Sequence, residues 1–144
     1  MRVTRRYRFA ASHRLNSAKL TEEENRELYG KCNNPYGHGH DYVLEVTVVG
    51  PRDSATGLVV QIPVLDQLVS EQVLRDFDQR YFNADVPEFA ELVPTSENIM
   101  RIIESRLKTC WRATFPGAWP RLDKIRLQET KRNSFQLSES ETTI

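Results

Sequence analysis

The chain has 144 residues, and its 20 Lys and Arg balance 20 Asp and Glu, so its formal net charge at pH 7 is zero. This balance argues against a dedicated nucleic-acid-binding protein, and no apolar run approaches the ~18 residues of a transmembrane helix. The two cysteines, Cys32 and Cys110, are too few for a disulfide framework. We therefore expect one domain over residues 1–144, located in the cytoplasm, with neither nucleic-acid nor membrane partners.

The first predicted element is a strand at residues 2–13, where apolar side chains fall on one face of a period-2 pattern. These side chains are Val3, Tyr7, Phe9 and Ala11. The arginines of the same segment would also suit a transit peptide, but the alternation favours a strand with a solvated arginine face. A polar, acidic segment at 16–30 follows, in which Thr21 opens a short helical or turn-like insert that Gly30 closes.

The middle of the chain is predicted to contain a shaped loop and a hairpin. Residues 31–40 include one Pro, two Asn and two Gly, a composition typical of a loop. Residues 41–49 alternate between apolar and polar side chains, as in a half-buried strand. The segment LVVQI at 58–62 is interpreted as the next strand, so that residues 41–62 would form a hairpin with a long loop.

Helical spacing starts at Pro63 and continues to Phe77. An irregular connection leads to a second helix after Pro94, with Thr95 or Ser96 as its N-cap and Glu97 in its first turn. Two last strands are expected, at 121–129 and at 133–138. Because strands and helices are segregated rather than alternating, the sequence predicts an α+β fold with an antiparallel sheet and helices on one face.

The only three histidines, His13, His38 and His40, all continue apolar strand faces. Side chains at i and i+2 of an extended chain point to the same side, so His38 and His40 can converge on one point. Three neutral imidazoles with an open fourth position describe a catalytic zinc site. The alternative is three separate histidines at polar corners of the fold, but their common phase favours zinc.

Two further residues have chemistry that suits this site. Cys32 lies six residues before His38 and next to Lys31, and a nearby cation or metal lowers a thiol's pKa. Cys32 could equally be a fourth zinc ligand or a small buried hydrophobe. Glu129 continues the apolar face of residues 125–127, either as a strand boundary or as a buried anchor. A carboxylate binds the N–H edge of guanine or pterin in bidentate fashion, although taken alone the position favours a boundary.

The segment GKCNNPYGHGH, with FAASHRL upstream, resembles the 6-pyruvoyltetrahydropterin synthase and 6-carboxytetrahydropterin synthase family. Similarity continues at DSATGLVV, PTSEN and RLQET, so it covers nearly the whole chain. The resemblance implies the tunnelling fold, a four-stranded antiparallel sheet with two helices on one face. It also implies a homohexamer of two stacked trimers, with active sites at the subunit interfaces.

The resemblance further implies roles for individual residues: zinc ligands His13, His38 and His40, a proton-transfer residue Cys32, a catalytic Asp78, a pterin-anchoring Glu129, and further pterin contacts Thr95, Ser96 and Glu97. The histidine of the family's Asp-His pair is Gln79 in this chain. Glutamine can hydrogen-bond but carries no proton at neutral pH. An acid–base partner of this kind is worth roughly 10²–10⁴-fold in rate.

The expected activity is that of a carbon–oxygen lyase with Zn2+ as cofactor and a pterin triphosphate as substrate. It would convert 7,8-dihydroneopterin triphosphate to 6-pyruvoyltetrahydropterin with loss of triphosphate, in tetrahydropterin biosynthesis. One alternative is the 6-carboxytetrahydropterin synthase reaction of the queuosine pathway, or a related side-chain cleavage. Another is a catalytically weak pterin-binding relative, because of Gln79. A zinc hydrolase unrelated to pterins would leave Glu129 and the Cys32 loop unexplained.

Overall fold

The computed structural model describes residues 1–139 and contains a five-stranded sheet in the order β3-β1-β2-β4-β5. The strands are β1 (Arg2–His13), β2 (His38–Val49), β3 (Arg80–Tyr81), β4 (Arg121–Gln128) and β5 (Ser134–Ser138). β1, β2, β4 and β5 form an antiparallel sheet, as predicted, and β3 adds a fifth strand parallel to β1. The family resemblance implied a sheet of four strands, and no sequence pattern predicted β3, because a strand of two residues is too short to show a periodicity.

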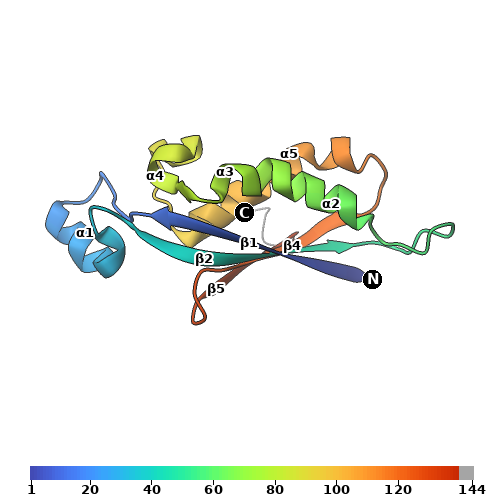
Figure 1. The fold of residues 1–144 in the computed structure, drawn as a ribbon, viewed down its shortest axis with the longest axis horizontal. Helices are drawn as coiled ribbons and strands as arrows, with labels where there is room; N and C mark the ends of the chain where they lie inside the picture. Colours follow the sequence, from blue (N-terminus) through green and yellow to red (C-terminus); the bar gives the residue numbers. More distant parts are fainter. Residues whose placement is uncertain (140–144) are drawn as a thin grey trace.

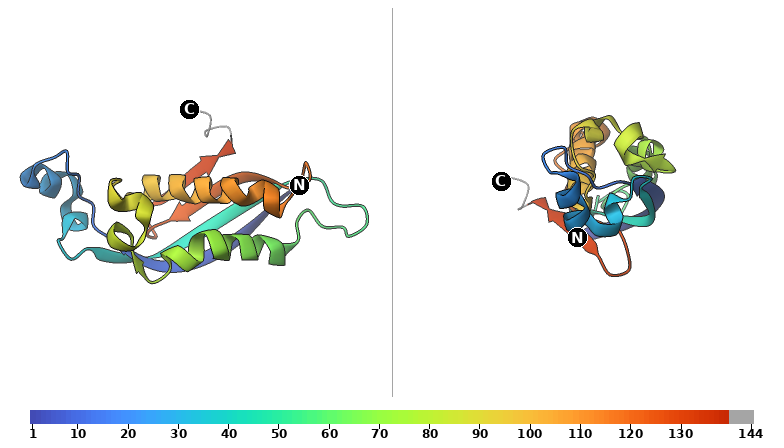
Figure 2. Two further views of the ribbon diagram at one scale, coloured as in Figure 1. Left: turned by 90° about the horizontal axis from the view of Figure 1, so that it is seen from above. Right: turned by 90° about the vertical axis from the view of Figure 1, so that its left-hand side faces the viewer.

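The helices other than the first, which projects from one end, cover one face of this sheet and confirm the predicted α+β fold (Figure 1). They are α1 (Glu22–Tyr29), α2 (Ile62–Val69), α3 (Arg75–Phe77), α4 (Phe82–Asp85) and α5 (Ser96–Thr114). A π-helical turn at Ser70–Leu74 joins α2 to α3, so the first predicted helix is one continuous run. Figure 2 shows α2 and α5 side by side across the sheet. None of the helices in residues 1–139 combines the length and the apolar character of a membrane span.

The predicted hairpin at 41–62 is wrong. Residues 58–61 form no strand, and α2 begins at Ile62. The reason lies in the pairing of β2, which has β1 along one edge and β4 along the other. With both edges of β2 occupied, the 58–62 segment cannot form a hairpin with it. Its apolar side chains serve the core instead, as the burial of Val60 shows.

β1 and β2 pair along their whole length, from Arg2 opposite Val49 to His13 opposite His38. This ladder makes β2 start at His38, three residues before the predicted strand, so His38 and His40 belong to the sheet rather than to the loop. The inner face of the sheet packs against the helices through these buried side chains: Tyr7, Phe9, Ala11, Tyr42, Leu44, Val46, Ile125 and Leu127 from the strands, and Leu65, Leu68, Ile99, Ile103 and Leu107 from the helices. All three histidines therefore lie at one end of a continuous apolar face.

The polar insert before β2 forms as its capping residues predict. Thr21 Oγ1 accepts from the backbone N–H of Glu24, and Glu24 Oε1 accepts from that of Thr21, which is a complete capping box. Gly30 ends α1, with φ at 55°. α1 projects from one end of the sheet, the end at which β2 begins (Figure 1).

Candidate metal centre and active site

Three imidazole rings meet where β1 ends and β2 begins. The ring centroids of His13 and His38 are 5.1 Å apart, those of His13 and His40 5.0 Å, and those of His38 and His40 4.6 Å. Gly37 permits this approach, because its φ is 73° and a Cβ there would lie 3.0 Å from the carbonyl oxygen of His13. In all three rings Nε2 is buried and has no hydrogen-bond partner within residues 1–139.

A hydrogen bond to the backbone orients His13 for metal binding. Its Nδ1 lies 2.8 Å from the carbonyl oxygen of Pro94. A carbonyl oxygen can only accept, so Nδ1 carries the hydrogen and Nε2 keeps a free lone pair, as in metal-ligating histidines. Burial lowers the pKa of His13 to about 4, and burial together with His40 lowers that of His38. Both rings are therefore neutral at pH 7, the form that binds a metal.

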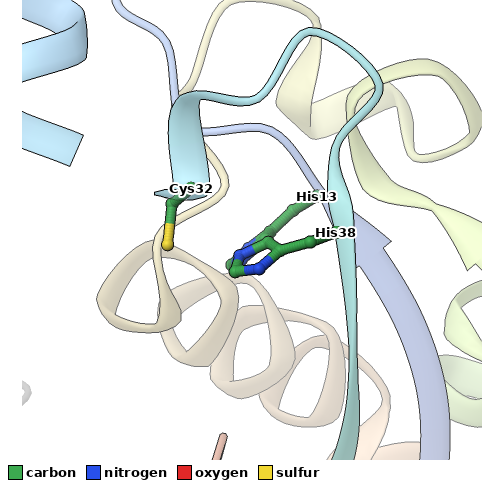
Figure 3. A group of neighbouring side chains, drawn as sticks. All are labelled: His13, Cys32 and His38. Carbon is green, nitrogen blue, oxygen red and sulfur yellow. The ribbon is translucent and has the colours of Figure 1, made fainter. Parts of the chain in front are cut away.

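Two overlapping sets of side chains could hold a metal ion. The ligand atoms of His13, Cys32 and His38 lie within 4.8 Å of one another, and so do those of His13, His40 and Glu129. Figure 3 shows the Cys32 thiol on the side toward which the rings of His13 and His38 point. His38 and His40 thus fall in different sets that share His13. Imidazole, thiolate and carboxylate are all zinc ligands, so either set suits this ion chemically.

Cys32 lies on a 3-10 turn, Gly30–Asn33, whose position is fixed by a hydrogen bond from Leu15 N to the Cys32 carbonyl oxygen. Burial, together with the negative charge of Glu129, raises the pKa of the thiol. The expected pKa-lowering effect of Lys31 is absent, because that side chain is exposed and burial has the larger influence. Without a metal ion, these surroundings favour the protonated thiol over the thiolate.

Glu129 follows β4 directly, and its side chain is only 14% exposed. Oε2 accepts a hydrogen bond of 2.5 Å from the hydroxyl of Ser96, and Oε1 lies 3.0 Å from His40 Nε2. The second contact pairs the carboxylate with the Nε2 edge of the His40 ring. His40 and Ser96 together lower the pKa of Glu129 to about 2. An ionised carboxylate therefore faces the three rings.

Known proteins share this chain's sequence and fold. A model of the family described as 6-pyruvoyl tetrahydropterin synthase matches residues 2–140. The chain belongs to this family. A 6-pyruvoyl tetrahydrobiopterin synthase from Poecilia reticulata is 42% identical over 131 residues, which are 91% of this chain and 85% of that protein. The human protein of the same name is 46% identical over 106 residues, 74% of this chain and 73% of its own length.

A solved structure supports the same assignment. The 6-pyruvoyl tetrahydropterin synthase of Caenorhabditis elegans has a TM-score of 0.86 and 36% identity, covering 96% of this chain and 94% of that one. An uncharacterized protein from Wolinella succinogenes, at 17% identity and a TM-score of 0.63, shares the fold. The predicted tunnelling fold is therefore confirmed as that of the 6-pyruvoyl tetrahydropterin synthase family.

The residues expected to form the Asp-His pair of this synthase family lie outside both ligand sets. Asp78 follows α3, and its Oδ1 accepts from the backbone N–H of Ala10 on β1. Gln79 has φ at 61°, and its N–H donates to the carbonyl oxygen of Ala10. These two hydrogen bonds attach the segment at residues 78–79 to the edge of β1. The fold of one chain therefore does not bring Asp78 to Cys32.

The three residues expected to contact pterin have different surroundings at the start of α5. Thr95 caps the helix, its hydroxyl accepting from the N–H of Asn98. Ser96 is buried against Glu129, whereas Glu97 is exposed. Among these three, only Ser96 makes a side-chain contact with the cluster.

Sequence reasoning missed two groups that lie beside the histidines. One is the Pro94 carbonyl, which orients His13 and has no sequence signal beyond its place before a helix. The other is Tyr42, one of the apolar side chains in the alternating pattern of residues 41–49. It is 0% exposed, and its hydroxyl has no hydrogen-bond partner within the described chain. Leaving a buried hydroxyl unpaired costs roughly 1–3 kcal/mol. Burial, with the charge of Glu129, raises the pKa of Tyr42, so the phenol keeps its proton.

Proposed function

We propose that this chain converts 7,8-dihydroneopterin triphosphate to 6-pyruvoyltetrahydropterin with loss of triphosphate, as a zinc-dependent step of tetrahydropterin biosynthesis. Membership of the synthase family makes the chain an enzyme of the carbon–oxygen lyase class. The observation that carries the proposal is the cluster of three unpartnered Nε2 atoms beside a thiol and an ionised carboxylate.

His13, His38 and His40 would hold the zinc ion. Each offers a buried Nε2 that makes no hydrogen bond within residues 1–139, and the hydrogen bond of His13 to Pro94 leaves Nε2 of that ring free to bind a metal. Three protein ligands leave a fourth position open, as in catalytic rather than structural zinc sites. A zinc ion bound there would supply Lewis-acid chemistry and make a coordinated substrate hydroxyl more acidic.

The remaining site residues would bind the pterin and move protons. Glu129 accepts hydrogen bonds from the N–H edge of the pterin ring, with Ser96 fixing one of its oxygens. Thr95 and Glu97 provide further pterin contacts at the start of α5. Cys32 Sγ exchanges protons with the substrate side chain, because the thiol is held next to the rings of His13 and His38.

The placement of Asp78 supports an assembly in which subunits share sites. Among the described strands, β5 has one edge from Ser134 to Leu137 that pairs with no strand, and β1 has another from Arg2 to Phe9. Unpaired strand edges of this kind favour pairing with another chain. We infer a homohexamer of two stacked trimers, in which Asp78 of one subunit acts with Cys32 of a neighbouring one. Each subunit would be a single domain, 1–144, in the cytoplasm.

Gln79 supports a second candidate, a pterin-binding relative with weak activity. It occupies the position at which the resemblance implies a histidine, and its backbone is fixed to Ala10. All three histidines of the chain belong to the metal cluster, so no imidazole remains for proton transfer. A side-chain amide cannot take over this role.

The test is incubation of zinc-loaded protein with 7,8-dihydroneopterin triphosphate, followed by identification of the pterin products by mass. Formation of 6-pyruvoyltetrahydropterin by the wild type, and not by Cys32→Ala, supports the proposal. Cys110→Ala is the matched control, since this thiol lies on α5 outside both ligand sets, and it should retain full activity. Formation of 6-carboxytetrahydropterin would assign the chain to the queuosine-type reaction. Bound pterin without turnover would contradict the enzyme reaction and favour the binding relative.

A further inference from the structure

Tyr42 lies on the same inward stripe of β2 as the histidines, two residues beyond His40. Its ring stacks on Phe9, with centroids 5.0 Å apart, and stands edge-on to His40 at 5.6 Å and to Phe82 at 6.1 Å. These contacts hold the ring in one place between the core and the candidate site. A phenylalanine ring would make the same packing contacts without a hydroxyl.

The unpaired hydroxyl is not an isolated feature. The buried side-chain nitrogen and oxygen atoms without a partner in residues 1–139 are four: Nε2 of His13, His38 and His40, and the hydroxyl oxygen of Tyr42. Buried polar groups in native proteins nearly always have partners, so each exception calls for an explanation. The three ring nitrogens are explained by a metal ion. The Tyr42 ring contacts the ring of His40, which places its unpaired hydroxyl with this same cluster.

The register of the sheet places Tyr42 beside Glu129. The β2–β4 ladder ends with Val43 opposite Gln128, so the next pair of neighbours is Tyr42 and Glu129. Directly opposed residues on one face have Cβ atoms about 4.5–5.5 Å apart. The carboxylate nevertheless makes its close contacts with Ser96 and His40 and not with the phenol. A molecule held by Glu129 is therefore the partner within reach of the hydroxyl.

We propose that the hydroxyl of Tyr42 donates a hydrogen bond to the pterin ring that Glu129 binds. This inference rests on the proposed function. A pterin presents two N–H donors on one edge, and an acceptor flanks them on either side, the C4 carbonyl oxygen and ring nitrogen N1. A carboxylate can engage the donors but not the acceptors, so recognition of the whole edge needs an adjacent donor. Tyr42 supplies that donor and makes the site selective for rings that carry an acceptor there.

The test compares Tyr42→Phe with Tyr7→Phe in zinc-loaded protein. Tyr7 is the matched control, because its hydroxyl donates to Asp66 Oδ1 at 2.8 Å and already has a protein partner. The probe is neopterin, whose fully oxidised ring does not undergo the proposed reaction, and calorimetry gives its Kd. We expect Tyr42→Phe to weaken neopterin binding about tenfold and to leave the melting temperature without ligand unchanged or higher. Tyr7→Phe should lower the melting temperature and leave the Kd unchanged.

With the triphosphate substrate, Tyr42→Phe should raise KM by a similar factor and leave kcat within about twofold. This is the result expected when a residue binds the substrate and the transition state equally well. Equal neopterin affinity of Tyr42→Phe and wild type would overturn this inference and leave the proposed function intact. Unchanged affinity together with a lowered melting temperature would overturn it too, because the hydroxyl would then serve the fold. Failure of the wild type to bind neopterin would contradict the proposed function, and this inference with it.

Discussion

The helix layer and the end of the sheet each contain a polar cluster, and the two differ in how their hydrogen bonds are satisfied. Arg106 of α5 donates through Nε and Nη2 to the two carboxylate oxygens of Glu88, and through Nη1 to Asp76 at 2.6 Å and to the Gln72 carbonyl at 3.1 Å. Every one of its guanidinium nitrogens has a protein acceptor.

The histidine cluster shows the opposite pattern. His13, His38 and His40 are packed against one another, yet Nε2 of each ring lacks a hydrogen-bond partner in the described chain. The Arg106 cluster joins α5 to α3 and to the turn at Pro87–Ala90, so it stabilises the helix layer. In this molecule the polar groups with hydrogen-bond partners hold helices together, whereas those without partners are the ones that we propose bind zinc and pterin.

The largest expected effect comes from removing one histidine. Removing a residue that only hydrogen-bonds a metal ligand lowers metal affinity roughly 10–100-fold. His38→Ala removes a ligand itself, so it should reduce zinc affinity by more than this and abolish lyase activity. It should change the free energy of unfolding of chelator-treated protein by less than about 1 kcal/mol, since this Nε2 makes no hydrogen bond. Zinc content by elemental analysis and urea denaturation measure the two effects. Full zinc content in His38→Ala would contradict the account.

Gln79→His tests the position where a proton carrier is expected. If the missing imidazole limits turnover, its introduction should raise kcat by a factor near the lower end of 10²–10⁴, with zinc content unchanged. Gln79→Asn is the matched control, because it changes the side chain without adding a titratable group. Steady-state kinetics measures the effect. An unchanged kcat in Gln79→His would show that Asp78 and Cys32 suffice.

Arg106→Leu tests the Arg106 cluster, whose hydrogen bonds are satisfied. In contrast to His38→Ala, it should lower stability and leave zinc binding unchanged. We expect a loss of about 1–2 kcal/mol in the free energy of unfolding, because two carboxylates lose charged hydrogen bonds that are partly exposed to solvent. Zinc content should stay the same as in the wild type. Urea denaturation and elemental analysis serve again. A loss of zinc with unchanged stability would remove the distinction between the two clusters.

The pH dependence of stability sharpens the same comparison. Burial lowers the pKa of folded His13 to about 4 from 6.5, so between these values the unfolded chain binds a proton that the folded chain does not. Stability of chelator-treated protein should therefore fall as the pH drops from 6.5 toward 4, by roughly 3 kcal/mol at most. The hydrogen bond with Arg106 lowers the pKa of Glu88, so the ionised Glu88 carboxylate stabilises the folded chain above pH 4.5. This contribution to stability is lost only below that pH. Urea midpoints that stay constant from pH 7 to pH 5 would contradict this.

Period-2 and helical patterns predicted the main strands and helices because each buries one face on the same core. The hairpin at 41–62 could not be excluded locally, since strand pairing depends on which edges of β2 are free. The phase of His13, His38 and His40 predicted their convergence. The unpaired hydroxyl of Tyr42 had no such signal, because its missing partner is a property of three-dimensional packing. For the same reason the attachment of Asp78 to Ala10 appears only in the folded chain.

The most direct test of the central claim is X-ray absorption spectroscopy at the zinc edge on the zinc-loaded protein. Because His13 belongs to two ligand sets, the identity of the remaining ligands decides between them. The account predicts three histidine nitrogens at about 2.0–2.1 Å, an oxygen from water in the fourth position, and no sulfur. A zinc–sulfur distance of about 2.3 Å would make Cys32 a ligand and contradict its role in moving protons.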